Sequence, residues 1–196
     1  MQDIIFATNN AHKVQEIRKR AEEFINIISL QEAGIHETIP EPFETLKENA
    51  SAKSHFIYER IHKNCFSEDT GLFVEALDGE PGVHSARYAG EEANDSANVE
   101  KLTRKMFGKE NRKASFTTII SLILEGNEYF FEGNCTGHIV EITNGDMGFG
   151  YDPIFIPDGS EKTFGEMNMD EKNKFSHRRK AVDQLLEFLS SKSDES

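Results

Sequence analysis

Two neighbouring acids, Glu68 and Asp69, stand at the end of a strand-like run and before a glycine-rich stretch that reaches Gly90. A buried strand that runs into a solvent-facing turn can hold such carboxylates rigidly while one of them stays open to a metal, a water molecule or a substrate. The structural alternative is a turn acid that accepts hydrogen bonds from its own backbone. The pair is therefore a candidate for metal or acid–base chemistry, and its meaning depends on residues elsewhere in the chain.

A second candidate is the turn Ala7-Thr8-Asn9-Asn10-Ala11-His12-Lys13. The apolar run before it predicts a strand and the apolar spacing after it predicts a helix, so the turn would bring polar side chains to a helix start. Free backbone N–H groups and the helix dipole attract anions there, and Lys13 adds a positive charge, which favours phosphate. The glycine spacing of a Walker P-loop is missing. Capping of the helix by Thr8 or Asn10 is the structural alternative.

A predicted helix contributes Asn49 and Lys53, which are four residues apart and share one face, with Glu48 to one side of them. An exposed Glu and Lys would be the ordinary reading of this pattern. Near the end of the chain, Ser176 occupies a position typical of a helix cap, and the two residues after it, His177 and Arg178, offer hydrogen-bond donors.

The stretch 144–153 interleaves three glycines with Phe149 and Tyr151. Glycine lets the backbone approach a flat ligand closely, and aromatic faces can stack on a base. A glycine-rich loop without function is the alternative. The stretch is therefore a candidate base-binding segment.

The elements that must position these residues alternate between strands and helices. Apolar spacing predicts an early helix with Val14, Ile17, Ala21 and Phe24 on its buried face, and three later helices. Runs rich in aromatic and β-branched residues predict a long antiparallel hairpin. The predicted later helices are 44–63, 94–107 and one around Val182–Leu189, and the hairpin strands are 116–124 and 129–142 around a turn at 125–128. The class is α/β with a mixed sheet.

The whole chain, 1–196, reads as one domain with a frayed tail at 190–196. Its net charge of −13 excludes a protein that wraps nucleic acid. Basic residues nevertheless cluster near both ends, as on a solvated helix face or at a local anion site. No apolar run is long enough to span a membrane and the start lacks a secretion signal, so we expect a cytoplasmic protein. Cys65 and Cys135 lack metal or redox spacing, and we expect both as small, mostly buried residues without a disulfide.

Taken in order, these motifs resemble the inosine triphosphate pyrophosphatase family over nearly the whole chain. The resemblance implies an elongated mixed β-sheet flanked by helices, with a substrate cleft between two lobes. It also implies hydrolysis of ITP, dITP and XTP to the nucleoside monophosphate and pyrophosphate, with Mg²⁺ as cofactor, in a homodimer. The matching motifs are Ala7-Thr8-x-Asn10-x-x-Lys13, Glu48-Asn49-Ala50 with Lys53, Glu68-Asp69-Thr70-Gly71-Leu72 with Pro81-Gly82-Val83 and Ser85–Gly90, and Gly148–Pro153 with Glu171-Lys172-Asn173 and Ser176-His177-Arg178.

The resemblance assigns roles residue by residue. Asp69 would be the proton acceptor, and Glu48 and Asp69 would bind magnesium. The residues expected to hold the triphosphate are Thr8, Asn9, Asn10, Ala11, His12, Lys13 and Lys53, with Thr70 also touching substrate. The residues expected to form the sugar and base pocket are Phe149, Gly150, Tyr151, Asp152, Lys172, His177 and Arg178. Bacterial members usually have Asp-Asp-Ser-Gly where this chain has Glu68-Asp69-Thr70-Gly71, a difference that concerns the fine metal geometry.

Three other functions stay open at this point. Asp69-Thr70-Gly71 matches the active-site triplet of aspartic proteases, but that chemistry needs two such aspartates sharing a proton, and the chain has one triplet. A catalytically silent nucleotide sensor would use the same pocket, although it would have no need of the acids. A pyrophosphatase that prefers pyrimidine or other modified nucleotides is the nearest alternative within the enzyme class.

Overall fold

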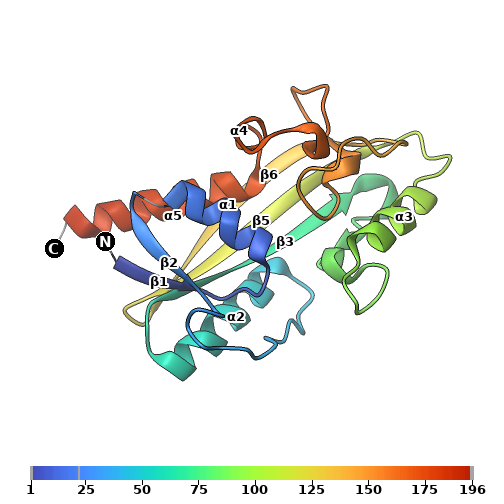
Figure 1. Cartoon of the computed structure of the whole chain (residues 1–196). Helices are drawn as coiled ribbons and strands as arrows, with labels where there is room; N and C mark the ends of the chain where they lie inside the picture. Colours follow the sequence, from blue (N-terminus) through green and yellow to red (C-terminus); the bar gives the residue numbers. More distant parts are fainter. Residues whose placement is uncertain (1, 22, 195–196) are drawn as a thin grey trace. The chain divides into compact units, whose positions relative to one another are not determined.

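The computed structural model describes residues 2–21 and 23–194 (Figure 1). Its helices are α1 (Ala11–Ala21), α2 (Leu46–Ile61), α3 (Asp95–Lys105), α4 (Met169–Lys172) and α5 (His177–Asp194). Its strands are β1 (Gln2–Phe6), β2 (Ile25–Ser29), β3 (Cys65–Val74), β4 (Pro81–Gly82), β5 (Lys113–Leu124), β6 (Asn127–Ile139) and β7 (Phe155–Pro157).

The strands of the described residues form one sheet in the order β2-β1-β3-β5-β6-β7, with β4 paired to β3. Strand β1 runs parallel to β2 and β3, whereas β4 is antiparallel to β3 and β7 is antiparallel to β6. The predicted mixed α/β sheet is therefore confirmed. No helix of the described part is long and apolar enough to cross a membrane.

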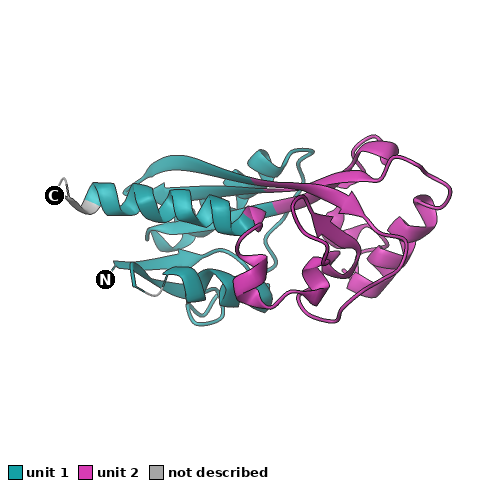
Figure 2. Cartoon of the chain, turned by 90° about the horizontal axis from the view of Figure 1, so that it is seen from above, with its two compact units in different colours: residues 1–69, 118–133, 178–196 teal, residues 70–117, 134–177 magenta. Residues whose placement is uncertain are grey.

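The chain divides into two compact units, each assembled from separate segments (Figure 2). Unit 1 comprises residues 1–69, 118–133 and 178–196, and unit 2 comprises residues 70–117 and 134–177. Strands β3, β5 and β6 each begin in one unit and end in the other. Consequently neither unit is a continuous stretch of sequence.

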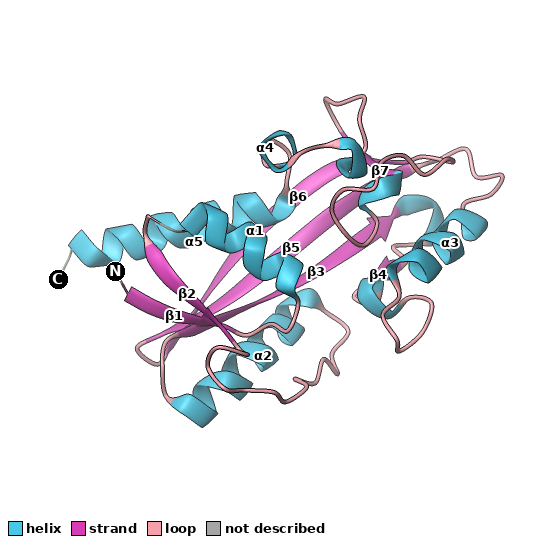
Figure 3. Cartoon of the chain, viewed as in Figure 1, coloured by secondary structure: helices cyan, strands magenta, loops and turns pink. Residues whose placement is uncertain are grey.

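Unit 1 is a sheet covered by helices on both faces, as Figure 3 shows. Ile4 and Phe6 of β1 pack with α1 and α5, whereas Ile5 and Ala7, which directly follows the strand, pack with α2. This alternation follows from the two-residue repeat of a strand. Because both faces are buried, the strand reads as a continuous apolar run rather than an alternating one.

Unit 2 has its own apolar core, formed by α3, the strand segments of the unit and the chain between β7 and α5. Three aromatic rings lie at its centre, with Phe116 packed edge-on against Phe155 at 4.8 Å and Phe164 next to both. Cys135 is buried in this core and Cys65 is buried in unit 1, as expected for small core residues.

Several predicted boundaries need correction. The first helix ends at Ala21, so Phe24 lies outside it and is exposed, with the Arg20 guanidinium over its ring. The hairpin turn consists of Glu125 and Gly126 alone, both with positive φ, because two such residues match the twist of paired strands.

Two other elements extend further than predicted. Helix α5 continues through residue 194, where a frayed tail from 190 was expected; residues 195–196 lie outside the described part. Strand β3 does not stop at the two acids but continues to Val74, because Leu72 and Val74 are buried in the core of unit 2.

Candidate active site

The neighbouring acids of β3 face opposite sides of the sheet. Phe66 packs in the apolar cluster shared with α1 and α5, whereas the Ser67 hydroxyl donates to the Ala50 carbonyl of α2. Alternate residues of a strand point to opposite faces. Glu68 therefore follows Phe66 toward α1 and α5, and Asp69 follows Ser67 toward α2. The two carboxylates enter separate polar clusters, both within unit 1.

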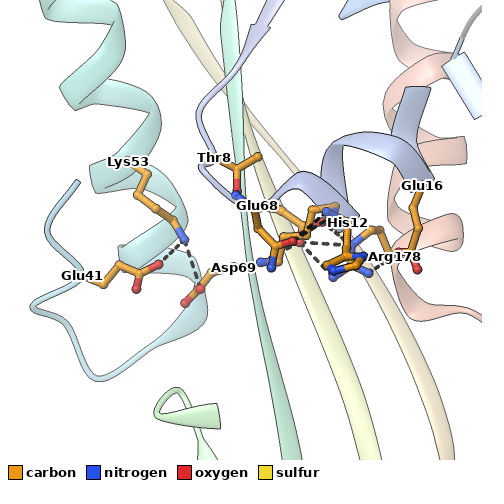
Figure 4. A network of polar contacts seen from close by, with 10 residues as sticks. Thr8, His12, Glu16, Glu41, Lys53, Glu68, Asp69 and Arg178 are labelled. Atoms are coloured by element: carbon orange, nitrogen blue, oxygen red, sulfur yellow. Dashed lines mark hydrogen bonds and ion pairs between the residues drawn. The ribbon is translucent and has the colours of Figure 1, made fainter. Parts of the chain in front are cut away.

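Glu68 is bound by cations from two helices (Figure 4). Arg178 of α5 donates to both carboxylate oxygens at 2.8–3.1 Å, and Lys13 Nζ of α1 lies 2.9 Å from Oε1. Arg178 also pairs with Glu16. Burial opposes ionisation of the fully buried Glu68, but Arg178 and then Lys13 outweigh it and hold its pKa well below the usual range. The formal charges of these four side chains sum to zero.

Asp69 belongs to a second cluster, in which Lys53 Nζ donates to Asp69 Oδ1 at 3.1 Å and to Glu41 Oε1 at 2.5 Å (Figure 4). Burial raises the pKa of Asp69, although Lys53 and Lys13 act in the opposite direction. For Lys53, the attraction of Asp69 and Glu41 outweighs burial and raises its pKa. One cation and two acids carry a net charge of −1, so this cluster attracts a further cation.

The residues of this second cluster fit a magnesium ion. Asp69 Oδ2 is buried and has no hydrogen-bond partner among the described residues. No group of three or more His, Cys, Asp or Glu side chains gathers there or elsewhere in the described part as a complete metal cage. Magnesium characteristically binds one or two carboxylates and fills its other positions with water and substrate phosphates. Asp69 and Glu41 provide such a carboxylate pair.

The structure brings Glu41, rather than the expected Glu48, to Lys53 and Asp69. Glu48 lies at the exposed start of α2, where its backbone N–H donates to Thr45 Oγ1 and its carboxylate accepts from the Thr45 hydroxyl at 2.6 Å. The bond to Thr45 Oγ1 caps the helix, with Thr45 as its N-cap residue. Sequence reasoning missed Glu41 because it lies in an irregular loop. The signal that could have found it is its position between two prolines, which restrict the backbone on both sides.

The turn after β1 is organised mainly by Asn10. Its Oδ1 accepts from the backbone N–H groups of His12 at 3.0 Å and Lys13 at 3.2 Å, while Thr8 Oγ1 accepts from the Asn10 N–H. Asn10 thus caps α1 and uses two of the N–H groups expected to meet an anion. Ala7 N donates to Phe66 O at 2.7 Å, so the turn begins beside the strand segment that carries Glu68.

Asn9 and Ala11, also expected to hold phosphate, provide no charged group at this turn. Asn9 donates to the Glu37 carbonyl at 3.4 Å, and Ala11 begins α1. The anion-binding potential of the turn therefore depends mostly on the Lys13 side chain, which is 17 % exposed in its contact with Glu68.

Residues Thr70 and Gly71 continue β3 into unit 2. Thr70 is partly exposed, whereas a Cβ atom at Gly71 would lie 2.6 Å from the Gly82 carbonyl oxygen of β4. Glycine is thus needed here for close strand pairing. The side chain bonded to Asp69 is Lys53, not a second aspartate. The Asp-Thr-Gly resemblance to aspartic proteases therefore has a packing explanation.

In unit 2, Asp152 organises the glycine-rich loop. Its Oδ2 accepts from the Phe149 backbone N–H at 2.9 Å and from Lys172 Nζ at 2.8 Å. Lys172 Nζ also lies over the Phe149 ring at 5.1 Å. A side chain at Gly148, where φ is +81°, would place Cβ 2.0 Å from Asp152 Oδ2. Three predicted residues, Phe149, Asp152 and Lys172, are therefore brought together.

The remaining predicted residues of unit 2 are mostly buried. The Tyr151 hydroxyl donates to the Ser85 carbonyl at 2.7 Å, and burial raises its pKa, so its ring belongs to the core rather than to a stacking surface. His177 is also buried and stacks on Phe116 at 4.7 Å. Gly150 N donates to Asp95 Oδ2 at 2.7 Å, which ties the loop to the start of α3.

Phe149 also borders a cavity of about 730 Å³ between its loop and α3. The charged side chains around this cavity are mostly acidic, namely Asp95, Glu100 and Asp146 against Arg104. Such a lining disfavours a triphosphate. Lys13 and Lys53 of unit 1 are better suited to phosphate groups.

Known proteins resemble this chain in both fold and sequence. The structure matches that of the Staphylococcus aureus Ham1 protein with a TM-score of 0.88 and 35% identity, covering 97% of this chain and 100% of that one. The dITP/XTP pyrophosphatase of Porphyromonas gingivalis is 50% identical over 190 residues, which is 96% of this chain and 98% of the relative.

A second relative, the dITP/XTP pyrophosphatase of Christiangramia forsetii, is 46% identical over 95% of this chain and 98% of its own length. The sequence model of the Ham1 family matches residues 4–188. The chain therefore belongs to the Ham1 family.

Proposed function

We propose that the chain hydrolyses non-standard purine nucleoside triphosphates, namely ITP, dITP and XTP, to the monophosphate and pyrophosphate, and so removes them from the nucleotide pool. The observation that carries the proposal is the acid–lysine cluster around Asp69, whose buried Oδ2 has no hydrogen-bond partner among the described residues. The names of the two relatives support the choice of substrates. Family membership supports an enzyme rather than a silent sensor.

Cleavage between the α and β phosphates requires that a water molecule be aligned and deprotonated. Lys53 holds Asp69 through Oδ1, which leaves Oδ2 to accept the proton from water. Burial raises the pKa of Asp69 and so brings its basicity closer to that needed for proton transfer at neutral pH. Asp69 is thus the general base of the proposal.

Charge on the triphosphate must also be offset. Lys13 and Lys53 would contact phosphate oxygens, with Thr8 to His12 forming the adjoining turn. Mg²⁺, held by Glu41 and, through water, by Asp69, would neutralise phosphate charge and polarise the scissile bond when bound. Glu48 is replaced in this role by Glu41 because Glu41 is the acid that contacts Lys53.

Base selection is assigned to unit 2. Phe149 would stack on the purine, and donors of Lys172 and His177 would read the base. A 6-keto purine presents an acceptor where adenine presents an amino group, so a fixed donor favours ITP and XTP over ATP. We do not assign this role to the Arg178 guanidinium, because it already binds Glu68 and Glu16.

A panel of nucleotides with detection of pyrophosphate, with and without Mg²⁺, tests the proposal. We expect release from ITP, dITP and XTP that depends on Mg²⁺ and exceeds that from ATP and GTP by about 10²-fold or more. Equal or faster turnover of ATP and GTP would contradict the proposed specificity. Preferred turnover of pyrimidine nucleotides would favour the alternative enzyme.

The resemblance also leads us to propose a cytoplasmic homodimer. Light scattering should then give twice the 22.2 kDa mass of one chain. A mass of one chain at micromolar concentration would contradict the dimer.

A further inference from the structure

We propose that Asn49 is a positioning residue that sets the affinity of the site for a divalent cation, by fixing the loop that carries Glu41. The inference rests on the proposed function, because it concerns the same acid–lysine cluster. Asn49 itself touches neither Asp69 nor Lys53 in the contacts described above. Its effect would be transmitted through the backbone of Phe43.

The loop that carries Glu41 has little regular structure of its own. Residues 35–43 contain neither helix nor strand, so no ladder of backbone hydrogen bonds fixes their conformation. The Glu41 side chain is 26 % exposed, which leaves it room to move away from Lys53. A carboxylate in such a loop needs an external anchor to stay in place.

Asn49 provides this anchor through both ends of its side-chain amide. The Phe43 N–H donates to Asn49 Oδ1 at 2.9 Å, and Asn49 Nδ2 donates to the Phe43 carbonyl at 2.9 Å. These paired bonds hold Phe43 as a neighbouring strand would. Asn49 is only 2 % exposed, so loss of its amide would take a buried partner away from the N–H and carbonyl groups of Phe43.

The helical spacing of α2 explains why the anchor acts on Glu41. Asn49 and Lys53 are four residues apart and lie on the same helix face. The first binds the loop two residues after Glu41, and the second binds the Glu41 carboxylate at 2.5 Å. Without the first contact, Glu41 would occupy its place beside Lys53 for a smaller fraction of the time. The apparent affinity for a cation falls in proportion to the fraction of molecules in which Glu41 lies beside Lys53.

Unit 2 offers a matched control in Asn98. Its Oδ1 accepts from the Ala89 N–H at 2.7 Å, its Nδ2 donates to the Ala86 carbonyl at 2.9 Å, and it is 1 % exposed. Asn98 therefore clamps a loop with the same chemistry and burial as Asn49. The loop that it clamps carries none of the proposed metal ligands.

The test measures binding of Mn²⁺, used in place of Mg²⁺, by electron paramagnetic resonance with pyrophosphate present. We expect Asn49→Ala to raise the dissociation constant for Mn²⁺ by about 10-fold or more, as loss of residues that orient metal ligands commonly does. We expect Asn98→Ala to keep the wild-type constant while losing a similar amount of stability. Amide hydrogen exchange at residues 41–45 should accelerate in Asn49→Ala alone.

Wild-type Mn²⁺ affinity in Asn49→Ala, or an equal loss in both variants, would overturn the inference and leave the proposed function standing. Failure of the wild-type protein to bind Mn²⁺, together with turnover that needs no Mg²⁺, would instead contradict the metal role in the proposed function. If Asn49→Ala does not fold, Asn49→Ser is measured in the same way. Serine has a shorter side chain with a single hydroxyl that cannot make both bonds to Phe43 at once, so its dissociation constant should exceed that of the wild type.

Discussion

At Asp69, burial and charge oppose each other. The carboxylate is 10 % exposed and shares Lys53 with Glu41, so the attraction of one lysine is divided between two acids. Its pKa is consequently raised despite the ion pair. A group in this state stabilises the fold poorly in its charged form, in keeping with the general-base role proposed for it.

Replacement of this carboxylate should separate activity from stability. We expect Asp69→Asn to lower turnover by about 10³-fold, because the proton acceptor is lost. The free energy of unfolding at neutral pH should equal or exceed that of the wild type. A raised folded-state pKa favours the fold below the unfolded value of about 3.9, and this advantage disappears as the pH rises through the folded-state pKa.

The advantage of the Asn variant should therefore grow as the pH rises from about 4 toward neutrality. Pyrophosphate release and urea unfolding at several pH values measure the two effects. Near-normal turnover would remove Asp69 from its role, and a large loss of stability would show that its charge holds the fold.

Glu41 and Glu48 form a matched pair of acids for a second test. We expect Glu41→Gln to raise the Mg²⁺ concentration needed for half-maximal turnover by about 10-fold or more, equivalent to about 1.4 kcal/mol. Glu48→Gln should change it little, because the Glu48 carboxylate bonds to the Thr45 hydroxyl at the start of α2. A larger increase in the Mg²⁺ requirement for Glu48→Gln than for Glu41→Gln would instead identify Glu48 as the metal ligand.

The family resemblance, rather than residue spacing alone, predicts that Lys53 and Asp69 share a site. The structure joins them by a hydrogen bond. Glu41 has no periodic pattern around it, so only three-dimensional contacts reveal it. Tyr151 was expected to stack on a base, but no local pattern distinguishes an exposed ring in a glycine-rich loop from one that bonds to Ser85 inside the core.

At the scale of secondary-structure elements, the contacts of Glu68 join one strand to two helices. It lies in β3, Lys13 in α1 and Arg178 in α5, and the latter two come from opposite ends of the chain. A fully buried carboxylate in such a position depends on its cations, because an unpaired buried charge is costly. The contact therefore helps to hold both helices against one face of the sheet.

Glu68→Gln should destabilise the protein by about 3–5 kcal/mol, because it leaves buried cations short of an anion. A lowered folded-state pKa gives stability that is complete above the unfolded value of about 4.3 and is lost as the pH falls toward the folded-state pKa. The difference between wild type and variant should therefore narrow below about pH 4.

Urea unfolding at pH 7 and at acid pH measures this difference. Glu100→Gln serves as the control, because it breaks an exposed pair with Arg104 on α3 and should cost no more than about 0.5 kcal/mol. Equal effects of the two substitutions would contradict a special role for Glu68.

Helices were easier to predict than short strands. The 3.6-residue spacing of apolar positions identified α1, α2, α3 and α5 from local sequence. Strands β4 and β7 contain only two and three residues, and they form because β3 and β6 offer them backbone partners. Such elements have no sequence period of their own, so only the tertiary structure defines them.

At the scale of the whole molecule, the two units share strands. Because β3, β5 and β6 pass from one unit to the other, loss of either unit would remove half of each strand from the sheet. We therefore expect one cooperative unfolding transition rather than two.

The tyrosines provide a test, because the chain has no Trp and two Tyr in each unit. Tyr58 and Tyr129 report on unit 1, and Tyr88 and Tyr151 report on unit 2. Fluorescence of Tyr58→Phe/Tyr129→Phe should follow the same urea midpoint as far-ultraviolet circular dichroism. Separate midpoints would show that the units unfold independently.

The opposite orientations of Glu68 and Asp69 have a consequence for strand register. If β3 slipped by one residue, Glu68 would turn toward Lys53 and Asp69 toward Arg178, and each acid would still face a cation. Charge alone thus tolerates two alignments of β3. The sizes of the neighbouring side chains permit only one alignment. The rings of Phe66 and Phe6 stack with centroids 4.4 Å apart, while the small Ser67 fits against the α2 backbone. The difference in bulk between Phe66 and Ser67 thereby decides which acid lies beside Lys53.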